Sequence, residues 1–263
     1  MTAWTAREWI RRVVLLLALP VALVATWWFA SRDSTNPFFP SLERILVAFG
    51  ETWVGPRLAE DLLPSMLRLA VGYGAALVLG VGIGLAIGSS QPLRALTEPV
   101  LEFVRAIPPP VLVPILMIVA GIGDRMKVLV IIFGCVWPIL LNTVEGVRGV
   151  DEVLADTCRS YRITGPARLR SLVLRSASPQ IMTGARQALS IGIILMVISE
   201  LFAANSGLGH AVVQFQRSFA YSQMWGGVLM LGLLGVLLAL LFRLVESRVL
   251  RWYHGIRAVQ KEW

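Results

Sequence analysis

Long apolar segments narrow the possible folds of this chain more than any other feature. Six of them approach the roughly 20 residues that a helix needs to cross a bilayer. They cover residues 13–30, 66–88, 99–120, 128–147, 181–204 and 225–242. Only 15% of the 263 residues are charged, whereas soluble proteins carry about 25%. We therefore predict an all-α membrane protein with about six transmembrane helices, organised as one domain over residues 1–263.

Two of these segments have alternative interpretations. The first follows Arg7, Arg11 and Arg12, as the apolar part of a signal peptide would, but no small-residue cleavage site follows it. We expect it to be retained as a span. In the third segment, residues 108–110 are all proline and would interrupt a helix. Two half-segments are therefore an alternative to one continuous span.

The basic residues predict how the chain is oriented. Six spans place both termini on one side, where sixteen of the 24 Lys and Arg residues fall, against seven on the other side. Basic residues collect in cytoplasmic loops of membrane proteins. We therefore expect both termini in the cytoplasm, and the net charge of +8 indicates orientation, with no nucleic-acid partner.

The sequence lacks the residues that several classes of protein require for their function. A P-loop needs a Gly-Lys pair, but the only lysines, Lys127 and Lys261, do not follow glycine, so the chain cannot hydrolyse ATP by that route. The two histidines, His210 and His254, have no catalytic spacing, and the two cysteines have no metal-binding spacing. We expect no catalytic or metal site, and transport is the large class that remains. An intramembrane enzyme or a membrane scaffold is the alternative from another class.

Two sequence patterns predict local structure. Small residues recur every four positions in the second segment, which lets a neighbouring helix approach closely; they are Gly72, Ala76, Gly80, Gly84 and Gly88. Apolar residues recur at helical spacing over residues 42–53, which predicts a short amphipathic helix on the membrane surface or on the protein.

Polar residues inside apolar spans are costly in lipid and therefore indicate a transport pathway. Asn142 and Glu145 lie three residues apart on one face of the fourth segment, and Arg186 and Glu200 lie in the fifth. Glu200 is expected to face the bundle interior. A structural or interfacial role for Glu145 and Arg186 is the alternative. The candidate pathway residues are Asn142, Arg186, Glu200 and the nearby Asn205.

The longest cytoplasmic loop, residues 148–178, is expected to dock a soluble partner. One short amphipathic helix is predicted before Gly165 and another over residues 167–174, with the break at residues 164–166. Gly165 is suited to end the first helix and Pro166 to start the second. A basic loop lying on a phospholipid surface is the alternative.

Short motifs follow one another along nearly the whole chain in a recognisable order and spacing. They are Phe39-Pro40-Ser41, Arg105-Ala106-Ile107-Pro108 with Pro114, Gly121-Ile122-Gly123-Asp124 with Lys127, Pro138 with Asn142-Thr143, Gly146-Val147-Arg148, Arg159-Ser160-Tyr161, and Ser199-Glu200 with Ala204-Asn205-Ser206-Gly207-Leu208-Gly209. In their order and spacing the chain resembles a known family, the permease subunits of ABC importers of the nitrate, sulfonate, taurine and bicarbonate group.

The resemblance implies a type I importer permease fold in which the 148–178 loop inserts into a groove on an ATPase subunit. The family's Glu-Ala-Ala motif is altered here to Asp156-Thr157-Cys158, Arg162 replaces the motif glycine, and Arg175 replaces its proline. Gly165 would then supply the turn. The residues expected to couple to the ATPase are Asp156, Arg159, Ser160, Tyr161 and Gly165.

The resemblance also implies the function and the partners. The chain would be the permease of an ATP-driven, binding-protein-dependent importer for a small anion such as a sulfonate, taurine or nitrate, in a bacterial inner membrane. It would hold no cofactor, because a cytoplasmic ATPase dimer binds ATP and Mg²⁺. A second permease copy, an extracytoplasmic binding protein and the bilayer complete the partners. Import of a nitrogenous compound such as a thiamine pyrimidine precursor is the alternative substrate.

Overall fold

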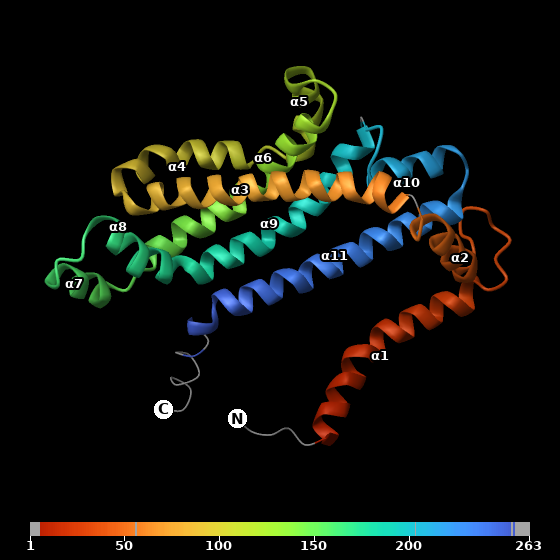
Figure 1. Ribbon diagram of the computed structural model, residues 1–263, viewed down its shortest axis with the longest axis horizontal. Coiled ribbons are helices and arrows are strands. Elements are labelled where there is room, and N and C mark those ends of the chain that lie inside the picture. The colour runs from red at the N-terminus through yellow and green to blue at the C-terminus, as the bar shows by residue number, and fades with distance from the viewer. Residues whose placement is uncertain (1–5, 56, 203, 254, 256–263) are drawn as a thin grey trace. The chain divides into compact units, whose positions relative to one another are not determined.

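The computed structural model describes residues 6–55, 57–202, 204–253 and 255, and within them it is helical with no strand (Figure 1). The predicted all-α class is therefore confirmed. The elements are α1 (Ala6–Ser31), α2 (Leu42–Trp53), a π-helical turn (Leu58–Leu62) that leads into α3 (Leu63–Ser89), α4 (Gln91–Arg105), a 3₁₀ turn (Pro109–Val111) before α5 (Leu112–Ala120), α6 (Asp124–Arg148), α7 (Glu152–Ser160), α8 (Gly165–Arg168), a second π-helical turn (Leu169–Val173) before α9 (Leu174–Phe202), α10 (Leu208–Arg217) and α11 (Tyr221–Val249).

Four helical segments of the described chain are long and apolar enough to cross a membrane. They are Leu58–Ser89, Asp124–Arg148, Gly165–Phe202 and Tyr221–Val249. A fifth span is counted if α4 and the following Pro109–Ala120 segment are taken together across their 71° bend. The first predicted segment contains a shorter apolar stretch, Leu17–Ser31. The structure thus gives four or five spans by this criterion, against about six predicted.

The bend between α4 and α5 has a local cause in the sequence. Pro108 is extended, with ψ at 123°, and the two prolines after it begin the short 3₁₀ turn. Proline lacks an N–H and disfavours helical backbone in the residue before it. The alternative of two half-segments is therefore confirmed, and the helical part starts at Gln91, earlier than residue 99.

Two compact units divide the chain, and the smaller comprises Met1–Leu58 with Ala211–Met230. The predicted amphipathic helix, α2, lies in this unit with the predicted bounds. Ser41 caps its first turn, and Ile45 and Trp53 are each only 1% exposed. An added Cβ at Gly227 would lie 3.5 Å from the Trp53 ring. The apolar face of α2 thus packs against protein.

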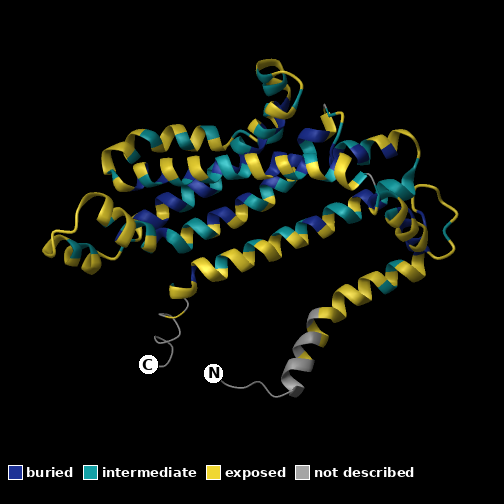
Figure 2. Cartoon of the chain, in the orientation of Figure 1, coloured by how far each residue is buried: buried dark blue, intermediate teal, exposed yellow. Residues whose placement is uncertain are grey.

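The larger unit comprises Ala59–His210 and Leu231–Trp263, and α3, α6 and α9 form its core (Figure 2). All five small residues of the four-residue repeat in α3 are buried. A Cβ at Gly80 would lie 2.8 Å from Ile139 Cγ2, and one at Gly84 2.6 Å from Thr143 Cβ. The predicted close approach is confirmed, and the neighbour is α6.

Candidate functional site

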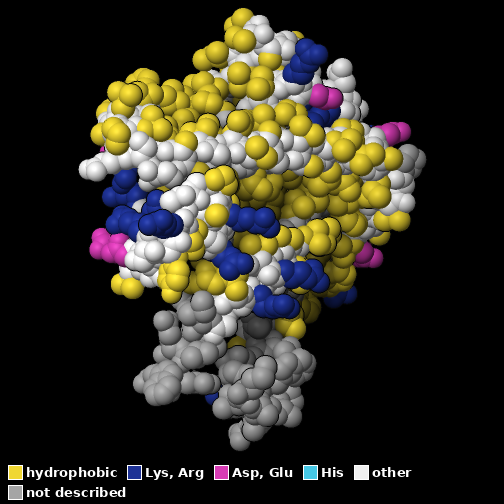
Figure 3. All heavy atoms as spheres, turned by 60° about the vertical axis from the view of Figure 1, so that its left-hand side comes forward, with side chains coloured by type: hydrophobic (Ala, Val, Ile, Leu, Met, Phe, Trp, Pro, Cys, Tyr) yellow, Lys and Arg dark blue, Asp and Glu magenta, His cyan; other side chains and the backbone are white. Residues whose placement is uncertain are grey.

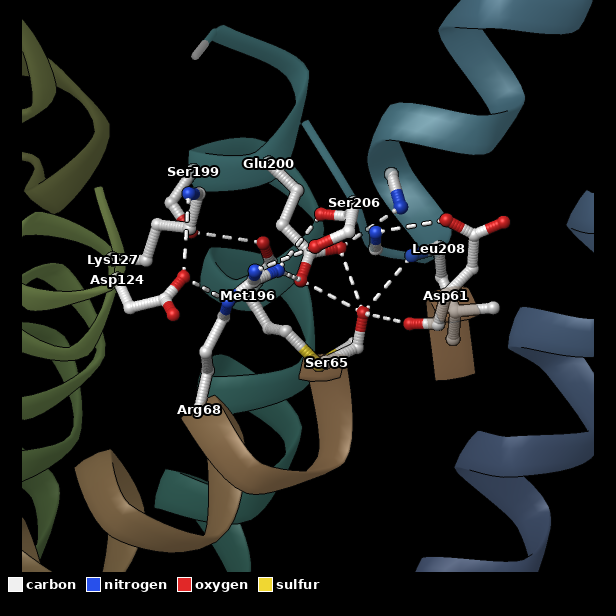
Figure 4. A network of polar contacts seen from close by, with 12 residues as sticks. Asp61, Ser65, Arg68, Asp124, Lys127, Met196, Ser199, Glu200, Ser206 and Leu208 are labelled. Carbon is white, nitrogen blue, oxygen red and sulfur yellow. Dashed lines mark hydrogen bonds and ion pairs between the residues drawn. The ribbon is translucent and has the colours of Figure 1, made fainter. Parts of the chain in front are cut away.

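Glu200 lies near the end of α9 and is 1% exposed, so the expectation that it faces the interior is confirmed. Both of its carboxylate oxygens accept hydrogen bonds (Figure 4). Arg68 Nη1 donates to Oε1 at 2.7 Å, the Gly209 N–H donates to Oε2 at 3.0 Å, and the Ser65 hydroxyl lies 2.7 and 2.9 Å from the two oxygens. The carboxylate is therefore fully engaged by protein donors.

Arg68 connects this carboxylate to two other parts of the chain. Its Nε donates to Asp124 Oδ1 at 2.8 Å, at the start of α6, while Nη1 and Nη2 donate to the carbonyl and hydroxyl oxygens of Ser206 at 2.9 and 3.0 Å. Lys127 Nζ lies 3.7 Å from the same Asp124 oxygen. Arg68 is 6% exposed, and its planar guanidinium supplies donors in several directions at once.

The segment before α10 closes over the same carboxylate. The Gly207 N–H donates to Asp61 Oδ1 at 3.0 Å, and the Leu208 N–H donates to Ser65 Oγ at 2.9 Å. Gly207 has φ +124°, and a Cβ there would collide with the Glu200 carboxylate. Only glycine meets both conditions at this position. We call these residues the outer network: Asp61, Ser65, Arg68, Asp124, Lys127, Glu200, Ser206, Gly207, Leu208 and Gly209.

The outer network ties the ends of three core helices and the start of α10 into one polar cluster. The sequence pointed to Glu200, whereas Asp61 and Ser65 precede the predicted second segment, residues 66–88, and Arg68 lies at its edge. Asp61, Ser65 and Arg68 are spaced by four and three residues, which places them on one face of a helix. This spacing was the sequence signal that the three polar side chains lie together. The network satisfies its own buried polar groups, and its chemistry is that of a structural support.

The other candidate pathway residues lie elsewhere. Asn142 Nδ2 donates to the Pro138 carbonyl at 2.8 Å and contacts Gln187 Oε1 at 3.4 Å. Asn205 is exposed in the segment between α9 and α10. The pathway role of both stays a prediction.

Arg186 forms an ion pair with Glu246 of α11, and the part of α11 from Leu231 onward belongs to the same unit as α9. Arg186 precedes Glu200 by fourteen residues on α9, which corresponds to about 21 Å along a helix. The structure therefore separates these two predicted pathway residues along the helix. The pathway role of Arg186 also stays a prediction.

The predicted docking loop begins with α7, whose N-cap Asp151 accepts a hydrogen bond from the Leu154 N–H at 2.9 Å. The helix ends at Ser160, and two backbone hydrogen bonds close its last turn. The Arg162 N–H donates to the Arg159 carbonyl at 2.9 Å, and the Ile163 N–H donates to the Cys158 carbonyl at 2.8 Å. This is the Schellman pattern, which needs a left-handed residue.

Arg162 is that residue, with φ +54°, at the position where the resemblance implies glycine. The prediction that Gly165 ends the first helix was wrong, because the backbone reverses three residues earlier. Gly165 has φ +57° and begins α8, with Pro166 in the first turn as predicted. The predicted second helix is not separate either, because Gly165–Phe202 forms one helical segment of 38 residues.

All five residues expected to couple to an ATPase are exposed: Asp156, Arg159, Ser160, Tyr161 and Gly165. Asp156 and Arg159 pair across one turn at 2.7 Å. Apolar side chains at both ends of α7 are exposed as well, with Val153 at 73% and Tyr161 at 76%. Among the described residues, no three His, Cys, Asp or Glu side chains are grouped to hold a metal ion.

Comparison with known proteins places the chain among transport proteins. Residues 76–251 match the family model described as "Binding-protein-dependent transport system inner membrane component". The chain is 29% identical over 252 residues to the taurine transport system permease protein of Escherichia coli K12, covering 93% of this chain and 91% of that protein. It is 27% identical to the nitrate import permease protein of Synechocystis, over 81% of this chain and 74% of that protein.

A solved structure supports the fold. The inward-facing methionine ABC transporter MetNI contains a chain with a TM-score of 0.58 and 18% identity, which covers 73% of this chain and 93% of that one. The helical arrangement is thus that of type I importer permeases, as the sequence resemblance implied.

Proposed function

The chain belongs to the family of binding-protein-dependent transport system inner membrane components, and from this premise we propose that it imports a small oxyanion of the sulfonate, taurine, nitrate or bicarbonate type. The chain is the permease subunit of such an importer, a multi-pass inner-membrane protein in a family that leaves ATP hydrolysis to other subunits. Similarity to the taurine permease over 93% of the chain carries the proposal. The named substrates of the relatives all bear an anionic oxygen group.

The partners and orientation follow from the same premise. We propose that two copies form the pathway, that an ATPase dimer binds on the cytoplasmic side, and that a binding protein delivers substrate outside. The distribution of basic residues supports cytoplasmic termini. The α7–α8 loop would then face the cytosol, and the outer network would lie at the opposite ends of the spans.

A continuous helix is the physical basis for coupling. The 38 residues of Gly165–Phe202 extend about 57 Å at 1.5 Å per residue, from the docking loop to Glu200. Force applied at α7 would be transmitted along this helix to the outer network, where Arg68 joins it to α3 and α6. Alternating access would thus arise from rocking of packed helices. In this scheme Glu200 acts as a support of the pathway.

Substrate uptake tests the proposed function. The permease, its ATPase and its binding protein would be reconstituted in liposomes with ATP inside, and uptake of labelled taurine, an alkanesulfonate, nitrate and bicarbonate would be measured. We expect ATP-dependent uptake of one of these anions. Uptake of a neutral or cationic pyrimidine with none of the four anions would contradict the proposed substrate class, and activity without any ATPase would contradict the importer.

Charge reversal in the docking loop tests coupling. We expect Asp156→Arg to lower substrate-stimulated ATP hydrolysis by about a hundredfold, because a like charge placed opposite a complementary surface costs several kcal/mol and each 1.4 kcal/mol is about tenfold. Membrane insertion should be unchanged, because Asp156 is exposed. Asp33→Arg, at another exposed acid, is the matched control. Wild-type hydrolysis in Asp156→Arg would show that α7 is not the coupling element.

A further inference from the structure

A groove between α9 and α11 combines positive charge with apolar walls. It has a volume of about 480 Å³ and is lined by Arg186, Leu189, Ser190, Ala239, Leu240, Phe242 and Arg243. All of these residues belong to the larger unit. We call this feature the α9–α11 groove. It is separate from the outer network.

The charges in the groove leave one cation available for a ligand. Arg186 is paired with Glu246, whose side chain is 16% exposed, so this pair is neutral. Arg243 also lines the groove, and neither an ion pair nor a hydrogen bond to its side chain occurs among the described residues. The local net charge is therefore +1. The ligand that complements it carries a negative group and an apolar part.

The position of the groove narrows the ligand further. Arg186 lies about 21 Å from Glu200 along α9, which is most of the roughly 30 Å thickness of a bilayer core. With the orientation proposed above, the two arginines lie near the cytoplasmic leaflet. Figure 3 brings forward the end of the larger unit that carries α7 and α8, and it shows Lys and Arg side chains next to hydrophobic surface there. The cytoplasmic leaflet is rich in anionic lipid, and basic pockets between spans on that side bind such headgroups.

We propose that the α9–α11 groove binds an anionic phospholipid, with its phosphate at Arg243 and an acyl chain along Leu189, Leu240 and Phe242. The exposed apolar surface of α11 supports this occupant. Leu240 is 54% exposed and Leu244 is 55% exposed, so α11 contacts the rest of its unit only weakly along this stretch. A lipid in the groove would fill the space and link the two helices.

A second copy of the chain fits the groove less well. In a two-fold dimer whose axis passes through the groove, two positive grooves would face each other, and like charges at an interface are unfavourable. A free anion satisfies the charge but leaves the apolar wall uncovered. The phospholipid is the occupant that satisfies both.

Lipid retention tests this proposal without any transport assay, so its outcome is independent of the imported substrate. The purified permease complex would be exchanged into nanodiscs of equal phosphatidylglycerol and phosphatidylcholine, extracted, and analysed by native mass spectrometry. We expect Arg243→Ala to lower phosphatidylglycerol retention by about fivefold, since one basic residue near an anionic surface contributes about 1 kcal/mol. Glu246→Gln should raise retention, because it removes the acid that neutralises Arg186.

Matched controls separate the possible occupants. Arg217→Ala, at the end of α10, should leave retention unchanged. Equal retention of phosphatidylglycerol in all variants, or equal retention of both lipids by the wild type, would overturn the proposal. Disulfide formation between two copies of Leu240→Cys would assign the groove to a second chain. Displacement of the lipid by inorganic phosphate alone would assign it to a free anion.

Discussion

Replacing Arg68 by methionine should destabilise the permease by about 3–5 kcal/mol, the usual cost of removing one partner from a buried ion pair. Glu200 is 1% exposed and would lose its ion-pair partner, which lies at 2.7 Å. Asp124 and both Ser206 oxygens would lose donors at the same time. The measurement is a denaturant titration of the permease in mixed micelles, which gives its free energy of unfolding.

An exposed arginine provides the control for this variant. Arg105 pairs with Glu102 at 2.7 Å, but the two side chains are 45% and 58% exposed. Such surface pairs contribute about 0–1 kcal/mol, so Arg105→Met should change the free energy of unfolding little. Equal losses in Arg68→Met and Arg105→Met would show that the outer network does not stabilise the bundle.

Two further variants separate charge from geometry in the outer network. Arg68→Lys keeps the positive charge but loses the planar fork that reaches Glu200, Asp124 and Ser206 together, so we expect an intermediate loss. Adding Glu200→Gln to Arg68→Met removes the unpaired buried charge and should recover part of the stability. No recovery would indicate that hydrogen-bond geometry, and not charge, dominates the network.

The elements that the sequence predicted correctly share one property: their signal is local. Residues 42–53 carry an apolar stripe at helical spacing, and α2 has the same bounds. The prolines at 108–110 forbid a regular helix, and the chain bends there. Small residues spaced by four in α3 imply a close neighbour, and α6 occupies that place. In each case a few adjacent residues determine the structure.

Helix ends were predicted less well, because hydropathy measures the match to lipid and not the extent of the helix. The fifth span was expected from residue 181, but the helical segment starts at Gly165, because several basic helical turns precede the apolar part. Similarly, α7 ends at a left-handed arginine. Arg162 has no conformational preference for that role, so the sequence directed attention to Gly165.

The contacts that join the outer network could not be predicted from the sequence for a different reason. Ser65 and Glu200 are separated by 135 positions, and their contact depends on the packing of α3 against α6 and α9. The sequence identified Glu200 as an ionisable residue that needs a partner, but it did not identify Arg68, because an arginine at the start of a span also suits the membrane interface. Only the three-dimensional packing distinguishes these roles.

Gly84→Ala should destabilise the permease by about 2–3 kcal/mol, near the upper end of the cost of overpacking a well-packed core. The new Cβ would lie 2.6 Å from Thr143 Cβ and 2.9 Å from the Leu140 carbonyl oxygen. Neither neighbour can move without shifting α6, because one is backbone and the other sits at the root of a buried side chain.

Gly82→Ala, two residues away on the same helix, has the opposite expectation. Nothing lies within 4 Å of a Cβ at Gly82, and alanine is favoured over glycine in a helix by up to about 1 kcal/mol. The difference between the two variants isolates the contact of α3 with α6 from helix propensity, and unfolding in mixed micelles measures it. If both substitutions shifted the free energy of unfolding equally, close packing at Gly84 would not be required. Opposite shifts would show that the four-residue repeat exists because helices associate in lipid through close van der Waals contact.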